Sequence, residues 1–113
     1  MVKKFEVLLL QEVKDFFDEI DNKAKQKILY NIKNAQVNND PRLLKKLTSS
    51  IWEFRTKYGN LQYRLFAFCD KSNELETLVV ATHGMIKKTD KVPGNEIEKS
   101  EMIRMNYFKE KKI

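Results

Sequence analysis

The sequence is poor in the residues that form cross-links and metal centres. It has one cysteine, Cys69, and one histidine, His83, among 113 residues. One cysteine excludes an internal disulfide and any multi-cysteine zinc site, and one histidine excludes a His-rich metal site. We therefore expect no metal and no cofactor, and the scarcity of cysteine favours the reducing cytoplasm.

Glycine and proline are also scarce, with three and two copies, so we expect mostly regular structure with short loops. No apolar run approaches the roughly 20 residues that cross a bilayer, so we expect no membrane association. The basic start is followed by a short apolar stretch that Glu6 interrupts, without a small-residue cleavage site, which predicts no signal peptide. The length predicts a single domain over residues 1–113.

The chain is basic, with 22 Lys and Arg against 16 Asp and Glu, a net charge of +6 and a pI near 9.4. A small basic domain attracts polyanions such as nucleic acid by releasing their counterions, although a charge of this size also serves plain solubility. The distribution is more informative than the total. Acidic residues cluster between residues 6 and 21, and the stretch from Arg55 to Lys91 is predominantly basic.

The first half of the sequence predicts a strand followed by two helices. Alternating apolar residues at 5, 7 and 9 suit a short strand. Apolar residues at 13, 16, 17 and 20 then follow a helical period. Asp21-Asn22 breaks that pattern and offers an N-cap for a second helix to about Asn38, which makes an αα-hairpin. Leu43, Leu44 and Leu47 predict one more helical turn.

The second half changes to a period of two at Ile51, which predicts strands. Gly59-Asn60 and the segment 70–73 are turn signals, so three runs (51–58, 61–69 and 75–83) form an antiparallel meander. A basic loop over 87–94 and a last helix over roughly 96–110 follow. The order β-α-α-β-β-β-α predicts an α+β domain, with an antiparallel sheet, an N-terminal helical hairpin and a C-terminal helix.

Charged residues on the predicted meander indicate the chemistry. The alternation places Glu53, Arg55 and Lys57 on one face of the first strand, and a face with three charges is either solvated or lines a groove. Arg64 lies on the partner strand across the turn, and His83 lies where the third strand ends. Lys87, Lys88 and Lys91 follow at once. Several cations with one imidazole suit a phosphodiester.

RNA is cleaved without a metal when its own 2′-hydroxyl attacks the adjacent phosphorus. The protein then aligns the atoms, transfers two protons and stabilises the phosphorane charge. Arginine binds two phosphoryl oxygens through its fork, and histidine transfers protons near neutral pH. The alternatives are ordinary: a charged strand face is usually solvated, and Trp52 and Phe54 are more typical of core packing than of base stacking.

Three ordered blocks of sequence resemble a known family. They are Ile51-Trp52-Glu53-Phe54-Arg55-Thr56-Lys57-Tyr58, then Gln62-Tyr63-Arg64-Leu65, then His83-Gly84-Met85-Ile86-Lys87-Lys88-Thr89-Asp90-Lys91-Val92-Pro93. Together they resemble the phage-derived, HigB-like branch of the RelE/ParE/HigB superfamily, the toxins of type II toxin–antitoxin modules. The resemblance implies a RelE-like fold, which agrees with the element order above.

The resemblance also implies an activity. RelE- and HigB-like members are endoribonucleases (mRNA interferases) that mostly cut mRNA in the ribosomal A site and so inhibit translation. By position, Arg55, Lys57, Arg64 and His83 are the expected catalytic residues: Arg64 on the phosphate, Lys57 for proton abstraction or charge stabilisation, and His83 for acid–base work. The expected RNA-binding residues are Lys87, Lys88, Lys91 and Tyr107, the last by stacking on a base.

The expected partners are mRNA, the ribosome and a cognate antitoxin, typically of the helix-turn-helix type, in a toxin–antitoxin hetero-oligomer. The acidic stretch from Glu12 to Asp21 is either a surface for that partner or a solvated helix face. Two other functions stay open: a ParE-like inhibitor of DNA gyrase, and an inactive module that only binds nucleic acid or its antitoxin. Retention of Arg55, Lys57, Arg64 and His83 favours cleavage over the ParE-like function.

Overall fold

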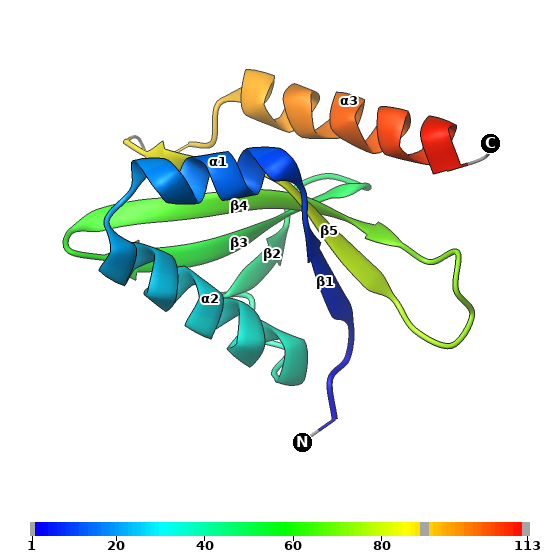
Figure 1. Cartoon of the computed structure of the whole chain (residues 1–113), viewed down its shortest axis with the longest axis horizontal. Helices are drawn as coiled ribbons and strands as arrows, with labels where there is room; N and C mark the ends of the chain where they lie inside the picture. The colour runs from blue at the N-terminus through cyan, green and yellow to red at the C-terminus, as the bar shows by residue number, and fades with distance from the viewer. Residues whose placement is uncertain (1, 89–90, 112–113) are drawn as a thin grey trace.

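The computed structural model describes residues 2–88 and 91–111. In this part of the chain, helices and strands follow one another in the order drawn in Figure 1. The elements are β1 (Glu6–Leu9), α1 (Gln11–Glu19), α2 (Asn22–Val37), β2 (Leu44–Lys46), β3 (Ile51–Tyr58), β4 (Leu61–Asp70), β5 (Leu78–Lys87) and α3 (Gly94–Lys111). The fold is therefore α+β, compatible with the RelE-like fold.

The strands form one mixed sheet in the order β1-β5-β4-β3-β2. The strands from β2 to β5 pair antiparallel, but β1 runs parallel to β5. The expectation of a wholly antiparallel sheet was therefore wrong at this one edge. Tight turns impose antiparallel pairing on chain neighbours, whereas β1 and β5 are separated by most of the chain and no turn sets their direction.

The segment predicted as an extra helical turn is the edge strand β2. Its residues Leu44–Lys46 pair with Trp52–Phe54, and the carbonyl oxygen of Leu43 accepts a hydrogen bond from the N–H of Arg55 at 2.8 Å. Three leucines are too few to distinguish the period of a helix from that of a strand. Pairing with β3 makes this segment a strand.

The helical hairpin is confirmed. The Asp21 carboxylate caps α2 by accepting from the N–H of Lys23, and the apolar stripe of α2 predicted from the sequence is buried. The meander is also confirmed, but its third strand covers Leu78–Lys87 instead of 75–83, so His83 lies inside this strand and not at its end. The hairpin between β3 and β4 turns at Gly59 (φ 57°) and Asn60 (φ 68°). Two successive positive φ angles match a tight turn whose twist suits the strands, and glycine and asparagine tolerate them best.

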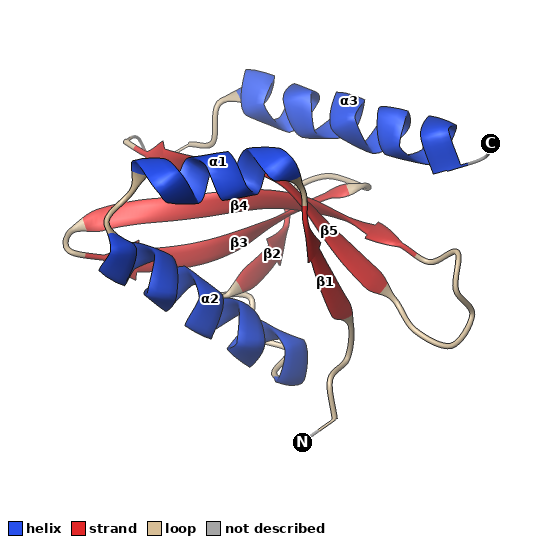
Figure 2. Cartoon of the chain, viewed as in Figure 1, coloured by secondary structure: helices blue, strands red, loops and turns tan. Residues whose placement is uncertain are grey.

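Helices cover both faces of the sheet (Figure 2), and each face has its own apolar core. The hairpin of α1 and α2 packs on one face, where Val13, Phe17 and Ile28 meet Leu65 and Ala67. On the opposite face, α3 covers a smaller cluster. Its members are Ile51, Phe66, Phe68 and Val80, with Ile97, Tyr107 and Phe108 of α3 packed against them.

Polar contacts tie the C-terminal end of α3 to the end of β4. The buried carboxylate of Asp70 accepts hydrogen bonds from the Tyr107 hydroxyl (2.7 Å) and the Lys111 ammonium (2.6 Å). Burial alone would raise the pKa of Asp70, but the hydrogen bonds from Lys111, Ser72 and Tyr107 outweigh it and hold the pKa well below 3.8. The ionised carboxylate therefore stabilises the position of α3.

Gly84 of β5 lets α1 pack closely on the sheet, which a first variant tests. A Cβ atom at this position would clash with the Phe16 ring and would lie 2.8 Å from Leu65 Cδ2. We expect Gly84→Ala to lower the free energy of unfolding by about 1–3 kcal/mol, measured by urea denaturation. Gly94→Ala is the control, because a Cβ there meets no atom within 4 Å; equal losses in both variants would contradict the close packing.

The Asp70 interaction predicts a pH dependence. Because the folded-state pKa is lowered, its contribution is present above the ordinary value of 3.8 and is lost as the pH falls below it. Asp70→Asn should lower the free energy of unfolding by about 2 kcal/mol near neutral pH. The difference from the parent protein should shrink on acidification through this range, as followed by urea denaturation. A difference independent of pH would show that the carboxylate charge is not what holds α3.

Candidate nucleic-acid interface

The strand register places the cations of the meander in adjacent rows on one face of the sheet. Arg55 of β3 pairs with Arg64 of β4, and Lys57 pairs with Gln62, which in turn pairs with Lys87 of β5. Alternate residues of a strand share a face and lie about 6.6 Å apart, so the two rows are neighbours. This is the face that α3 covers at the other end of the strands.

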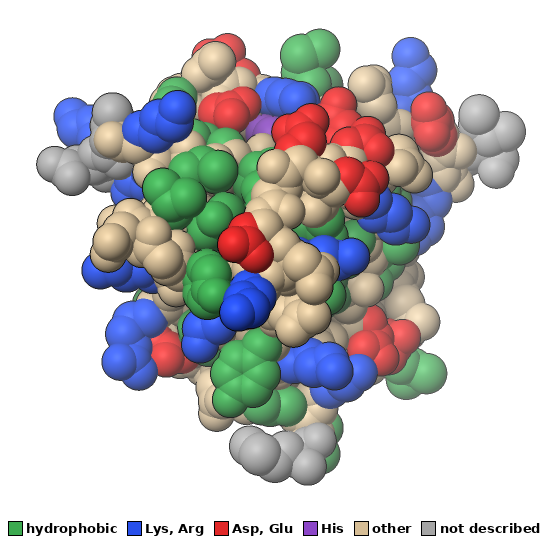
Figure 3. Space-filling view, turned by 60° about the vertical axis from the view of Figure 1, so that its left-hand side comes forward, with side chains coloured by type: hydrophobic (Ala, Val, Ile, Leu, Met, Phe, Trp, Pro, Cys, Tyr) green, Lys and Arg blue, Asp and Glu red, His purple; other side chains and the backbone are tan. Residues whose placement is uncertain are grey.

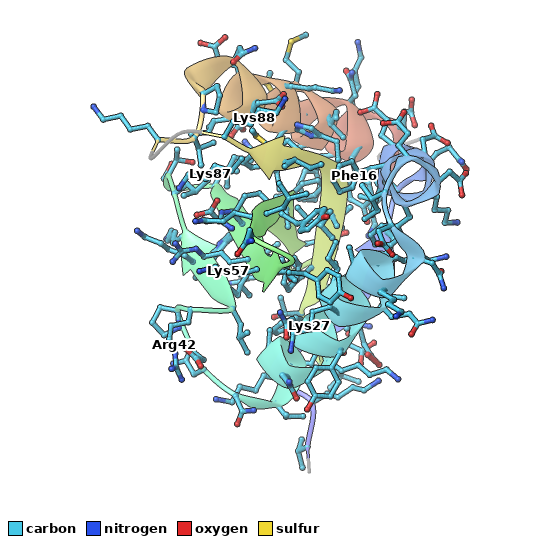
Figure 4. All side chains as sticks on the ribbon, turned by 90° about the vertical axis from the view of Figure 1, so that its left-hand side faces the viewer. Phe16, Lys27, Arg42, Lys57, Lys87 and Lys88 are labelled. Carbon is cyan, nitrogen blue, oxygen red and sulfur yellow. The ribbon has the colours of Figure 1, made fainter. Side chains whose placement is uncertain are left out.

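Most of these side chains line an open hollow of about 230 Å³. It is formed by Arg42, Arg55, Thr56, Lys57, Gln62 and Arg64, with four cations and no carboxylate among them. Figure 4 shows Arg42, Lys57 and Lys87 along one side of the molecule, with Lys27 on the side of the helical hairpin. We call this hollow the basic hollow. Its charge and its polar lining suit a phosphate group.

A buried ion pair lies next to the basic hollow, between Arg64, which lines the hollow, and Glu53, which does not. Glu53, expected on a solvated or groove-lining face, is only 3% exposed, because Arg64 Nε lies 3.2 Å from its Oε1. Its other oxygen lies 3.8 Å from Nε of Arg55. Neither expected alternative, a solvated position or a groove-lining one, holds for Glu53. Arg64 on β4 and Arg55 on the same strand supply the positive charge that its burial requires.

Arg64 is held rigidly by its neighbours. Besides the contact with Glu53, its Nη1 donates to the carbonyl oxygen of Tyr63 at 3.1 Å and its Nη2 donates to Gln62 Oε1 at 2.7 Å. A guanidinium carries five N–H donors, so one N–H on each terminal nitrogen remains. Burial lowers the pKa of Arg64, the Glu53 carboxylate raises it and Arg55 lowers it further, but an arginine keeps its charge.

The residues predicted to bind RNA divide between two places. Lys87 lies beside the basic hollow through its pairing with Gln62, and Lys88 follows it, exposed (Figure 4). Lys91 is exposed in the segment before α3. Tyr107 lies elsewhere, because its hydroxyl bonds Asp70 at the far end of β4 and its ring packs against Phe68. The structure does not bring Tyr107 to the basic hollow.

His83 shares the sheet face of Arg64 but is covered by the start of α3. It pairs with Phe66, one row beyond Arg64, and its ring stacks on the Phe66 ring with centroids 5.0 Å apart. It is 3% exposed, and its Nε2 lies 3.4 Å from the carboxylate of Glu96. His83 lines a different hollow, together with acidic residues of α1. The structure thus brings Arg55, Lys57 and Arg64 together but leaves His83 apart.

Sequence reasoning missed Arg42. The side chain lies in the turn before β2 and pairs with Asp40 at 3.0 Å, and it reaches the basic hollow because β2 joins the sheet beside β3. The leucines at 43, 44 and 47 predicted a helical turn and not a strand beside β3, so nothing in the sequence placed Arg42 near the basic hollow. The Asp40-Pro41 turn, which was recognised, fixes only where the preceding helix ends.

The Glu53–Arg64 pair predicts a non-additive effect on stability. Arg64→Met leaves the Glu53 carboxylate buried without its nearest cation, so we expect a loss of about 3–5 kcal/mol in the free energy of unfolding. The double variant Glu53→Leu/Arg64→Met should recover most of that loss, because no buried charge remains. Urea denaturation of the two single variants and the double variant measures the coupling. Additive losses would contradict the pairing.

Comparison with known proteins finds one matching family. No helix in residues 2–88 and 91–111 is long and apolar enough to cross a bilayer. No curated protein shows significant sequence similarity to the chain. The profile of one family, Phage derived protein Gp49-like (DUF891), matches residues 15–104, a stretch that runs from α1 into α3 and includes the whole basic hollow. The chain therefore belongs to the Gp49-like family of phage-derived proteins.

Proposed function

We propose that this protein is the toxin of a type II toxin–antitoxin module, of the HigB-like branch, and that it cleaves mRNA on the ribosome in the cytoplasm. The observation that carries the proposal is the basic hollow, where Arg42, Arg55, Lys57 and Arg64 converge and outnumber the carboxylates of Asp40 and Glu53 that contact them. Membership of a phage-derived family supports it, as does the resemblance of the three sequence blocks to RelE-like toxins. The proposed partners are the message, the ribosome and a helix-turn-helix antitoxin.

The proposed reaction uses the nucleophile of the substrate. The 2′-oxygen loses its proton and bonds to phosphorus, the bond from phosphorus to the 5′-oxygen breaks, and the 5′-oxygen takes a proton. The products are a 2′,3′-cyclic phosphate and a 5′-hydroxyl. The two non-bridging oxygens of the phosphate share one negative charge and gain a second on the way to the phosphorane, and donors already fixed in place stabilise that charge most effectively.

The contacts in the basic hollow suggest a role for each cation. Arg64 is fixed by Glu53 and Gln62 with one N–H left on each terminal nitrogen, which suits two phosphoryl oxygens. Arg55 lies beside it in the same row. Lys57 is exposed in the next row, where we propose that it abstracts the proton or stabilises the charge. Lys87 and Lys88 extend the cationic surface along the RNA.

Loss of single cations tests the proposal. In cells that express the chain without an antitoxin, we expect Lys57→Ala and Arg55→Ala to relieve growth arrest and to lower the rate of message cleavage about 100-fold, because each removes stabilisation of the transition state. Cleavage is measured by mapping message ends. Thermal unfolding should change little for Lys57→Ala, because Lys57 is exposed. It should change only moderately for Arg55→Ala, because Arg64 remains as the nearest cation of the buried Glu53.

Lys27→Ala is the matched control, since it removes the same charge from an exposed position on α2 (Figure 4). Undiminished toxicity of both hollow variants would remove the basic hollow from the mechanism. A halt of DNA replication before protein synthesis would instead favour a gyrase inhibitor, and absence of growth arrest would favour a binding module.

The acid–base role of His83 stays a prediction with its own test. His83→Gln keeps a hydrogen-bonding side chain of similar size but cannot transfer protons near neutral pH. If His83 acts on the reacting oxygens, this variant cleaves messages about 100-fold more slowly with an unchanged fold. An unchanged rate would exclude the His83 ring from the cleavage chemistry, while its packing against Phe66 would remain.

A further inference from the structure

A second hollow, opposite in charge to the basic one, lies at the open edge of β5 between α1 and α3. It measures about 250 Å³, and we call it the acidic hollow. Its polar lining is Glu12, Asp15, Glu19, His83 and Lys99, with Phe16 and Gly84 completing the wall. Figure 3 shows acidic side chains gathered beside the chain's one histidine, which is visible as a small purple area.

The contacts of the Thr82 hydroxyl bear on which nitrogen of the His83 ring carries the hydrogen. This hydroxyl has one hydrogen and lies near three groups: the carbonyl oxygen of Phe66 at 3.2 Å, the Ser100 hydroxyl at 2.9 Å and Nδ1 of His83 at 3.0 Å. In the arrangement in which it donates to Phe66, it accepts from both other neighbours. Nδ1 then carries the hydrogen, and Nε2 of the neutral ring presents a lone pair.

That lone pair has no donor. Nε2 of His83 is buried without a hydrogen-bond partner, and its nearest polar neighbour, Oε1 of Glu96 at 3.4 Å, is itself an acceptor. Burial, followed by Lys99, lowers the pKa of His83 more than Glu96 and Glu12 raise it, so the ring is neutral at pH 7. Two acceptors face each other, and a buried acceptor favours a donor from outside.

The carboxylates of the hollow are only partly neutralised by cations. Lys99 binds Glu12 at 3.1 Å, and Asp15 accepts only an uncharged amide N–H from Gln11. In the part of the chain that the structure describes, neither Asp15 nor Glu19 has an ion-pair partner. The three carboxylates thus outnumber the single ammonium, and a visiting cation meets a net negative charge.

We propose that the acidic hollow binds the ammonium or guanidinium group of an organic cation, which donates one N–H to Nε2 of His83 and others to the carboxylates. A basic side chain of a partner protein and a free polyamine share this chemistry. Lys99 occupies part of the hollow and competes with the ligand for Glu12. The site is separate from the basic hollow, so it stands or falls independently of RNA cleavage.

The single histidine makes the site directly observable by NMR, because the imidazole ¹⁵N signals of the whole protein come from one residue. In the free protein we expect the Nδ1–H tautomer. Titration with the peptide acetyl-Ala-Arg-Ala-amide or with spermidine, at constant ionic strength, should shift the Nε2 signal saturably. Absence of a saturable shift with both probes, or an Nε2–H tautomer in the free protein, would overturn the proposal. A shift with the peptide alone supports a protein partner, and one with spermidine alone supports a polyamine.

Removing carboxylates and removing the lysine of the acidic hollow should change its affinity for the cation in opposite directions. Asp15→Asn/Glu19→Gln should weaken binding by at least about tenfold, the effect of about 1.4 kcal/mol. Lys99→Ala should strengthen it, because it frees Glu12. The matched controls Asp18→Asn on α1 and Lys109→Ala on α3 change the charge of exposed residues outside the hollow. Controls that change binding as much as the hollow variants would show a diffuse electrostatic effect and would contradict a defined site.

Discussion

The packing of α3 against one half of a sheet face is the constraint on which the rest of the structure depends. Phe66 and Phe68 of β4 are covered by Tyr107 and Phe108 of the helix, so that half of the face is apolar and dry. Farther along the same strand, Arg64 lines an open hollow. One strand face therefore changes from apolar core to cationic surface within a few residues, and the extent of the helix sets where the change occurs.

The Glu53–Arg64 pair stands at that boundary. Glu53 is buried in the row of Phe66 and His83, whereas its partner Arg64 belongs to the row of Arg55. The attraction between opposite charges is stronger in low-dielectric surroundings than in water, but an unpaired charge there is costly. The carboxylate thus stabilises an arginine at the rim of the core and orients its fork. It also offsets part of the repulsion between Arg55 and Arg64, which face each other across the strands.

The sequence predicted the elements of the meander because local chemistry decides them. The turn at Gly59-Asn60 sets the register, and counting back from Tyr58 and Leu61 already pairs Arg55 with Arg64. The conjunction of Arg55, Lys57 and Arg64 was therefore predictable from alternation and one turn. Other features depend on distant parts of the chain. Arg42 reaches the basic hollow only because β2 joins the sheet edge, which no local period reveals.

The placement of His83 also depends on distant parts of the chain and could not be predicted from local sequence. β5 has an irregularity beside Thr82, where Phe66 pairs with His83 but Ala67 pairs with Ala81. Such a bulge re-aims the side chains that follow it. With α3 above, the ring contacts Thr82 and Glu96 and opens toward the acidic hollow. The position of a bulge and the place where a terminal helix packs are decided by tertiary structure. The local sequence around His83 therefore did not predict them.

The central claim is that fixed cations in the basic hollow let a message cleave itself through its own 2′-hydroxyl. The most direct measurement uses ribosomes programmed with a message whose cut site has been mapped, prepared with a single 2′-deoxy nucleotide on the 5′ side of that bond. The account predicts that the deoxy message stays intact at this position, while the all-ribose message yields a 2′,3′-cyclic phosphate end. Cleavage of the deoxy message at the same bond would contradict it.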